Sequence, residues 1–257
     1  MKSVGPGADS LLSCSRLCKS FGGVRALVDV SIKFDSNSVT SVVGPNGAGK
    51  TTLLDVLSGF VRPDKGNCFI GPTSISTLSP YLIARLGIAR TFQEVRLIRE
   101  MSVLENVLLA GSRELTESIL GAVFRPLNVN DENRQDSAMS VLKLCGLETI
   151  ARNRAGSISY GQQKLLTLAC AIGSCAQTLL LDEPMSGVHP ELSSQIADLL
   201  IRYRDEGKSL IVVEHDISFV RNVSDRVIVM AAGAVIAEGG PADIFSRPNV
   251  LEAYLGH

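Results

Sequence analysis

The chain alternates between short apolar runs and segments with helical spacing. Strand-like runs of β-branched and aliphatic residues, bounded by glycine, proline or polar residues, lie at 39–43, 88–92, 178–184, 209–215, 227–231 and 235–237. Between them, residues 53–57 have helical spacing, and Ser79-Pro80 begins a helix that Gly87 ends. Strands that alternate with helices predict an α/β protein with a mostly parallel sheet, whose functional residues gather at the carboxyl ends of the strands.

Two stretches differ from this alternation. Residues 11–43 have the pattern of short strands joined by tight turns, such as Phe21-Gly22-Gly23. From about residue 94 to 165 the pattern is helical. Residues 1–10 are polar and contain no apolar core, so we expect a flexible tail rather than a signal peptide. We therefore expect one domain over 11–257, with a helical subdomain at about 94–165.

The helical region carries two apolar stripes. Val103, Val107 and Leu108 share one helix face. A second stripe, at i, i+4 and i+8, either packs within its own domain or docks another protein; it comprises Leu115, Ile119 and Val123. Four arginines in and before this region are expected on a solvated face: Arg85, Arg90, Arg96 and Arg99.

Composition narrows the classes of protein. A net charge of −1 over 257 residues gives no general attraction to nucleic acid or to an anionic membrane, so we expect no nucleic-acid partner. The six cysteines form no C-x-x-C pair, which argues against a disulfide framework or a zinc site. The uncharged run 165–181 resembles a membrane span, but Gly173-Ser174 divides it into helix and strand. We expect a soluble protein that reaches a membrane only through a partner.

A glycine-rich loop after the first apolar run carries the clearest chemistry. Residues 44–51 fit G-x-x-x-x-G-K-[ST], with a strand before and a helix after. Such a loop points successive backbone N–H groups at a phosphate. Lys50 is then expected to reach the β- and γ-phosphates and Thr51 to bind Mg²⁺. The loop predicts a nucleoside triphosphatase or kinase core, with these phosphate-binding candidates: Gly44, Pro45, Asn46, Gly47, Ala48, Gly49, Lys50, Thr51 and Thr52.

Further candidates lie at strand ends and at one helix start. The strand at 178–184 delivers Asp182, the expected Mg²⁺ residue, next to Glu183, and the strand at 209–215 ends in His215. Ser159 to Gln162 form a capping box that begins a helix. Phe21 either stacks on an adenine ring or packs in a sheet core.

These motifs, in this order and spacing, resemble those of the ATP-binding subunits of ABC transporters from about residue 12 onward. The resemblance implies a P-loop (RecA-like) α/β core with a mostly parallel sheet, an N-terminal antiparallel β subdomain and an inserted α-helical subdomain. It also implies one role for each motif. Phe21 stacks on adenine, 44–51 is the Walker A loop, and Gln93 is the Q-loop glutamine and a metal ligand. Residues 158–162 are the signature, 179–182 is the Walker B strand, Glu183 is the catalytic carboxylate and His215 is the switch histidine.

Two positions depart from the common pattern of that family. Tyr160 stands where most members have the first glycine of the signature, and His189 stands where Asp or Asn is usual. Tyr160 resembles the branch that takes up branched-chain amino acids, as do three further phrases, at 90–93, 237–245 and 250–256.

The resemblance implies an assembly as well as an activity. Two identical or homologous chains pack head to tail, so that Ser159, Gly161 and Gln162 meet the ATP bound by the opposite chain. The cofactors are ATP and Mg²⁺. The partners are transmembrane permease subunits and, indirectly, a substrate-binding protein, with the ATPase peripheral on the cytoplasmic face of the inner membrane. The expected activity is ATP hydrolysis coupled to uptake of branched-chain or related amino acids.

Two alternatives compete with this function. An ATPase of a lipid or lipopolysaccharide exporter keeps the same motifs. A soluble ABC protein acting on DNA or ribosomes usually has a long coiled-coil insert or two cassettes, and the chain has neither. A simple P-loop kinase is disfavoured because it does not require the signature or His215.

Overall fold

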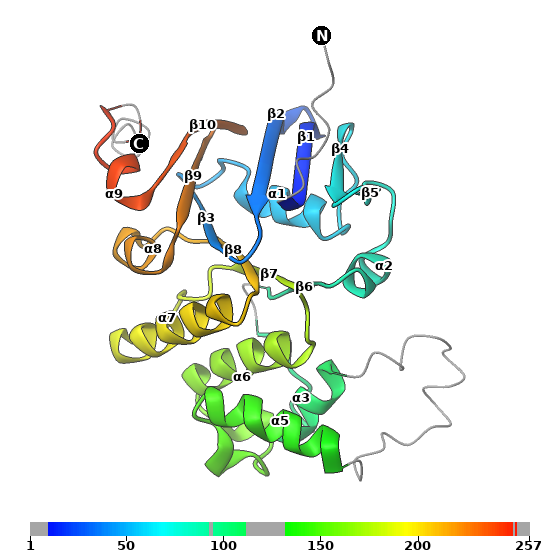
Figure 1. Cartoon of the computed structure of the whole chain (residues 1–257), viewed down its shortest axis with the longest axis vertical. Helices are drawn as coiled ribbons and strands as arrows, with labels where there is room; N and C mark the ends of the chain where they lie inside the picture. Colours follow the sequence, from blue (N-terminus) through cyan, green and yellow to red (C-terminus); the bar gives the residue numbers. More distant parts are fainter. Residues whose placement is uncertain (1–9, 93–94, 112–131, 249, 251–257) are drawn as a thin grey trace.

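The computed structural model describes residues 10–92, 95–111, 132–248 and 250. Its central sheet has six strands in the order β10-β9-β3-β8-β7-β6 (Figure 1). Every neighbouring pair is parallel except β9 and β10, which confirms the predicted mostly parallel sheet. The strands are β3 (Val39–Val43), β6 (Ile88–Arg90), β7 (Thr178–Asp182), β8 (Ser209–Val213), β9 (Arg226–Ala231) and β10 (Ala234–Gly239).

A second, antiparallel sheet has the order β2-β1-β4-β5. Its strands are β1 (Ser10–Phe21), β2 (Val24–Asp35), β4 (Lys65–Ile70) and β5 (Thr73–Ser74). Sequence analysis predicted short strands here, whereas β1 and β2 have 12 residues each. Register shifts along the β1–β2 pair interrupt the alternation of apolar residues, which explains why each long strand looked like shorter ones.

The helix after the glycine loop joins the two sheets. Helix α1 (Lys50–Leu57) buries Leu53, Leu54, Val56 and Leu57. These side chains share one core cluster with Leu12 and Leu27 of the antiparallel sheet and with strands of the central sheet. This shared core holds the glycine loop between the sheets. Helix α2 (Pro80–Arg85) follows, with the predicted Ser79 cap.

A helical layer lies below the central sheet in Figure 1. It contains α3 (Val103–Ala110), α5 (Glu132–Leu144) and α6 (Tyr160–Gly173), and Val103, Val107 and Leu108 form a buried face as expected. The predicted stripe of Leu115, Ile119 and Val123 lies outside the described residues. The C-terminal part adds α7 (Pro190–Asp205), α8 (Ile217–Val223) and α9 (Pro241–Ile244).

The uncharged run at 165–181 divides as predicted, because α6 ends at Gly173 and β7 begins at Thr178. Within the described part of the chain, no helix is both long and apolar enough to cross a membrane. All six cysteines are free thiols, in agreement with the absence of a disulfide pattern.

Candidate active site

The glycine loop between β3 and α1 leaves a helix start without a side-chain cap. Gly49 is the N-cap of α1, makes no side-chain hydrogen bond, and is followed by no acidic residue in the first turn. Gly49 has φ 96°, and a Cβ there would lie 2.3 Å from the Ala26 carbonyl oxygen, so only glycine fits. The first N–H groups of a helix have no intrahelical acceptor and favour an anion. The loop is therefore shaped as a phosphate cradle.

Lys50 folds back over this loop. Its Nζ donates hydrogen bonds to the carbonyl oxygens of Gly44 and Pro45, at 2.8 and 2.9 Å. Burial lowers the pKa of Lys50, while the negative charges of Glu183 and Asp182 oppose that shift. The charges of both carboxylates therefore act on the ammonium group, and an incoming phosphate can replace the two carbonyl groups as its partners.

The end of β7 presents two carboxylates in different settings. Asp182 is buried, and burial raises its pKa although a hydrogen bond from Arg90 acts in the opposite direction. Glu183 follows with φ 47°, a left-handed conformation that is strained for a residue other than glycine. Its N–H donates to the Val213 carbonyl oxygen of β8 at 3.0 Å, which helps to hold this conformation. Strained backbone of this kind is common at functional sites.

His215 lies just beyond β8, with 63% of its side chain exposed. Its neighbour Glu214, which the sequence prediction did not single out, has no exposed surface. Glu214 accepts hydrogen bonds from the N–H groups of Met185 and His215, at 2.7 and 3.1 Å. Burial raises the pKa of Glu214, and these two N–H groups partly offset the shift. A charged residue at the end of an otherwise apolar run is the signal that could have identified it.

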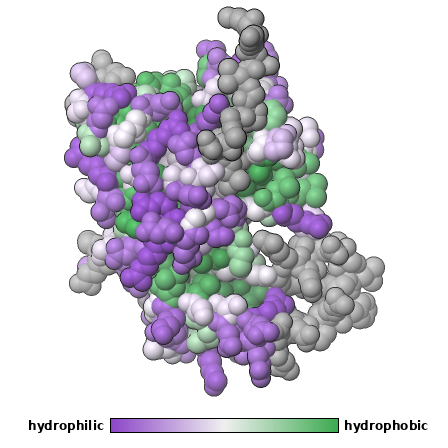
Figure 2. All heavy atoms as spheres, viewed as in Figure 1, coloured by the Kyte–Doolittle hydropathy of each residue, from purple (hydrophilic) through white to green (hydrophobic). Residues whose placement is uncertain are grey.

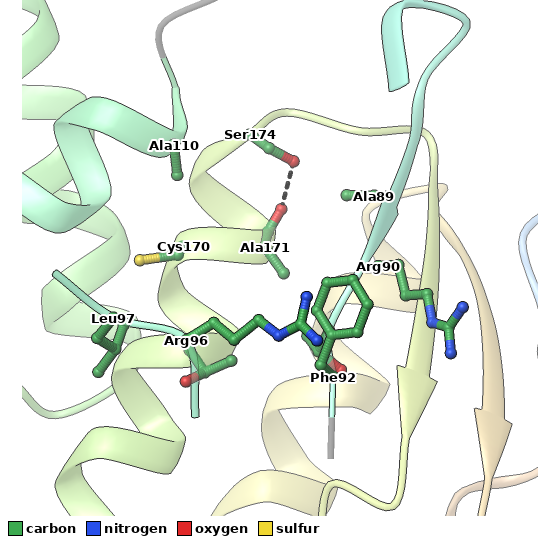
Figure 3. Close-up of a pocket in the computed structure, with 11 residues that line it drawn as sticks. Ala89, Arg90, Phe92, Arg96, Leu97, Ala110, Cys170, Ala171 and Ser174 are labelled. Carbon is green, nitrogen blue, oxygen red and sulfur yellow. Dashed lines mark hydrogen bonds between the residues drawn. The ribbon is translucent and has the colours of Figure 1, made fainter. Parts of the chain in front are cut away.

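Arg90 corrects one prediction. Sequence analysis placed it on a solvated face, but only 5% of its side chain is exposed, and its guanidinium pairs with Asp55 and Asp182. The burial is possible because these two carboxylates compensate the charge. Beside it, a cavity of about 260 Å³ opens between β6 and α6, bordered by Phe92, Arg96 and Cys170 (Figure 3).

Phe21 ends β1 with 47% of its surface exposed, so the alternative of packing in a sheet core is wrong. Lys19 Nζ lies 5.3 Å from the centre of its ring. The exposed ring is available to stack on a flat ligand. Gln93 lies outside the described residues.

The start of α6 is not brought to the glycine loop of the same chain. Figure 1 shows α6 in the helical layer, whereas α1 lies up against the sheets. Ser159 and Gln162 form the predicted capping box, in which Gln162 N–H donates to Ser159 Oγ at 3.3 Å and Ser159 N–H donates to Gln162 Oε1 at 3.0 Å. Tyr160 is half exposed and lies against Gly187, where a Cβ would be 3.1 Å from the ring. This contact accommodates the tyrosine that replaces the usual glycine.

Thr51 and Asp182 supply oxygen atoms suited to a Mg²⁺ ion that a bound nucleotide would also coordinate. Among the described residues, no group of three or more His, Cys, Asp or Glu could hold a metal ion. Thr51 at the loop is exposed, and Asp182 supplies a carboxylate near Lys50. Hydroxyl and carboxylate oxygens suit Mg²⁺, which usually completes its octahedral shell with phosphate oxygens and water.

Comparison with known proteins gives consistent matches. A family model described as ABC transporter matches residues 27–186, and one described as branched-chain amino acid ATP-binding cassette transporter matches residues 234–257. The chain is 39% identical over 246 residues, covering 96% of this chain and 95% of the relative, to a probable branched-chain amino acid transport ATP-binding protein, LivG, of Archaeoglobus fulgidus.

Two solved structures are also similar. The ADP conformation of an ATP-binding cassette of an ABC transporter has a TM-score of 0.85 and 33% identity, covering 96% of this chain and 99% of that chain. A dimeric post-hydrolysis state of an ATP-binding cassette, bound to ADP and Pi, has a TM-score of 0.75 and 26% identity, covering 90% and 98%.

Proposed function

The chain belongs to the ABC transporter family of ATP-binding proteins and is an ATPase, and from this premise we propose that it powers an importer of branched-chain or related amino acids. The proposal is supported by the C-terminal match to the branched-chain amino acid model and by the name of the archaeal relative. The observation that carries it within the structure is the Lys50 ammonium, which folds over the loop before an uncapped helix start and carries a charge on which Asp182 and Glu183 act.

Each group of the site has a part in phosphoryl transfer to water. The N–H groups of 47–51 and the Lys50 ammonium hold the phosphates, and the exposed Phe21 ring stacks on adenine. Thr51 and Asp182, with Gln93, would hold Mg²⁺, which neutralises phosphate charge when bound. Glu183 orients and polarises the attacking water, and His215 donates a hydrogen bond to the γ-phosphate.

The second half of the site comes from another chain. Ser159 and Gly161 begin α6 in the helical layer, away from the glycine loop of the same chain. In a head-to-tail dimer of identical or homologous chains, Ser159, Gly161 and Gln162 meet the ATP held by the partner's loop. ATP then bridges the two subunits, and its hydrolysis loosens the dimer.

Transmembrane permease subunits are the direct partners, and a substrate-binding protein acts through them. The ATPase domain over 11–257 binds them at the cytoplasmic face of the inner membrane. The cavity beside Phe92 and Arg96 borders the segment that leads to Gln93, where contact with a permease can alter the ATP site. Figure 2 shows hydrophobic side chains around α2, where Leu82 in the helix and Leu86 at its C-cap are exposed.

Uptake measurements test the proposal. Cells of the source organism that lack this chain should lose high-affinity uptake of radiolabelled leucine, isoleucine and valine. The unmutated chain should restore uptake, and Lys50→Ala should not, whereas Lys65→Ala, which changes an exposed lysine, serves as the matched control. Normal uptake with impaired lipid or lipopolysaccharide export would contradict the proposal in favour of the exporter.

A further inference from the structure

Arg90 occupies a buried position that links three elements of the ATP site. Its NH1 group donates hydrogen bonds to Asp55 Oδ1 at 2.7 Å and to Ser58 Oγ at 2.9 Å, both on or at the end of α1. Its NH2 group donates to Asp182 Oδ2 at 3.1 Å, at the end of β7. Arg90 itself ends β6. One planar group therefore ties the helix of the phosphate loop to the carboxylate of β7.

The summed charge of Arg90, Asp55 and Asp182 favours the binding of a metal cation beside them. Two carboxylates, Asp55 and Asp182, share a single guanidinium, so the trio keeps one net negative charge. Asp182 Oδ2 is engaged by Arg90, and no hydrogen bond from a described residue reaches Oδ1. Arg90 therefore fixes the orientation of the carboxylate through one oxygen without using the other.

Aromatic rings fix the guanidinium in turn. The Arg90 guanidinium carbon lies 5.1 Å from the centre of the Phe92 ring and 5.8 Å from that of Phe60, and the two rings meet edge to face. Arg96 stacks on Phe92 at 3.8 Å, so the Phe92 ring lies between two guanidinium groups (Figure 3). A planar, forked cation suits this setting, whereas a lysine ammonium can neither stack in this way nor span both carboxylates.

Stability of the fold does not account for this arrangement. The Nε–H of Arg90 is buried, and no described residue accepts a hydrogen bond from it. A buried donor without a partner is unfavourable, and buried ion pairs are weak sources of net stability compared with apolar residues of similar size. The position of Arg90, against Asp182 and three residues before Gln93, connects it to the metal side of the site instead.

We propose that Arg90 is a positioning residue for the metal side of the ATP site: its guanidinium holds the Asp182 carboxylate in place, while Asp55 and Phe92 hold the guanidinium. The proposal rests on the proposed function, because it needs Asp182 to serve Mg²⁺. Partners that orient a metal-binding carboxylate commonly change metal affinity about tenfold to hundredfold when they are mutated. Arg90 does not touch the nucleotide in this role, so its removal should affect metal binding rather than metal-free nucleotide binding.

The test separates these two affinities in the full-length chain. A fluorescent, non-hydrolysable ATP analogue is first titrated in EDTA, and Mn²⁺ binding to the analogue-loaded protein is then followed by electron paramagnetic resonance. Arg90→Gln and Arg90→Lys should each bind the analogue in EDTA as the unmutated chain does and bind Mn²⁺ about tenfold to hundredfold more weakly. Asp55→Ala, which leaves Arg90 and Asp182 in place, should also weaken Mn²⁺ binding.

Arg85→Gln is the matched control, because it removes an exposed arginine whose guanidinium donates a hydrogen bond to the Tyr81 hydroxyl. Mn²⁺ binding by Arg90→Gln that is as tight as in the unmutated chain, or tighter, would overturn the proposal. A Mn²⁺ affinity of Arg90→Lys equal to that of the unmutated chain would also overturn it. Should Arg90 variants fail to fold, as judged by circular dichroism, Asp55→Ala alone decides: unchanged Mn²⁺ affinity then overturns the proposal. If the unmutated chain binds no analogue in EDTA or with Mn²⁺, the proposed function fails instead.

Discussion

The Met185 N–H donates a 2.7 Å hydrogen bond to Glu214 Oε1, a side-chain oxygen of a residue with no exposed surface. The other oxygen, Oε2, accepts from the His215 N–H at 3.1 Å. One buried carboxylate thus connects the segment that follows Glu183 with the segment that carries His215. Glu214 therefore holds the segments after two different strands, which carry the candidate catalytic residues Glu183 and His215, in relation to each other.

The raised pKa of Glu214 predicts how stability depends on pH. Burial raises the pKa in the folded chain above the ordinary value of 4.5, so the folded state keeps this proton to higher pH than the unfolded state. The contribution of Glu214 to the free energy of unfolding must then fall as pH rises from about the ordinary value through the raised one. Glu214→Gln cannot titrate and should lack this fall.

Urea denaturation followed by circular dichroism at several pH values from 5 to 8 checks this prediction. The free energy of unfolding of the unmutated chain, minus that of Glu214→Gln, should fall as pH rises. Glu206→Gln, which changes an exposed glutamate, controls for the loss of a carboxylate. A constant difference across this range would contradict the prediction.

Local patterns predicted the elements well where the pattern lies within one segment. The strand 39–43, the helix from Ser79-Pro80 to Gly87 and the capping box at Ser159 were confirmed, because each depends on neighbours in sequence. The lengths of β1 and β2 were not predicted, because their register shifts depend on which strand pairs with which.

The buried charges of the site could not be predicted in this way. Arg90 bonds to Asp55, which is 35 residues away in the sequence, and to Asp182, which is 92 residues away. Glu214 bonds to Met185, which is 29 residues away. Taken alone, an arginine or a glutamate is expected at the surface, since the cost of burying a charge is offset only by partners from other elements. The motif residues were identified because their chemistry requires fixed spacing, whereas the residues that hold them have no such spacing.

Phe21→Ala should weaken ATP binding without destabilising the fold. The ring is 47% exposed, so its loss removes a stacking surface rather than a core residue. Base stacking on an aromatic side chain contributes about 1–3 kcal/mol, which corresponds to roughly fivefold to more than a hundredfold in affinity. Titration with a fluorescent ATP analogue measures the affinity, and thermal denaturation measures the stability. An unchanged affinity would show that Phe21 does not stack on the base, and a large loss of stability would show that the ring contributes to the core.

Glu183→Gln should retain ATP binding and lose most turnover. The amide fills the same space but cannot polarise water as a carboxylate does, and loss of such a group slows the reaction about a hundredfold or more. Because ATP would persist, the ATP-bound dimer should accumulate in size-exclusion chromatography with light scattering, whereas Glu206→Gln should turn over ATP normally. A variant that stays monomeric with MgATP at micromolar concentration would argue against ATP as the bridge.

The last prediction locates the active site between two chains. If Ser159 serves the ATP held by the partner's Lys50, Lys50→Ala and Ser159→Arg chains should each be inactive alone. A heterodimer isolated with two affinity tags places both lesions in one site and leaves the other site intact. Its ATPase activity should therefore reappear, at about half of the unmutated dimer if the sites act independently.

A heterodimer of the unmutated chain with the doubly mutated chain provides the opposite arrangement, because each of its two sites contains one lesion. The shared site predicts activity in the first heterodimer and none in the second. A site built within one chain predicts the reverse, so activity in the second heterodimer alone would refute the head-to-tail arrangement.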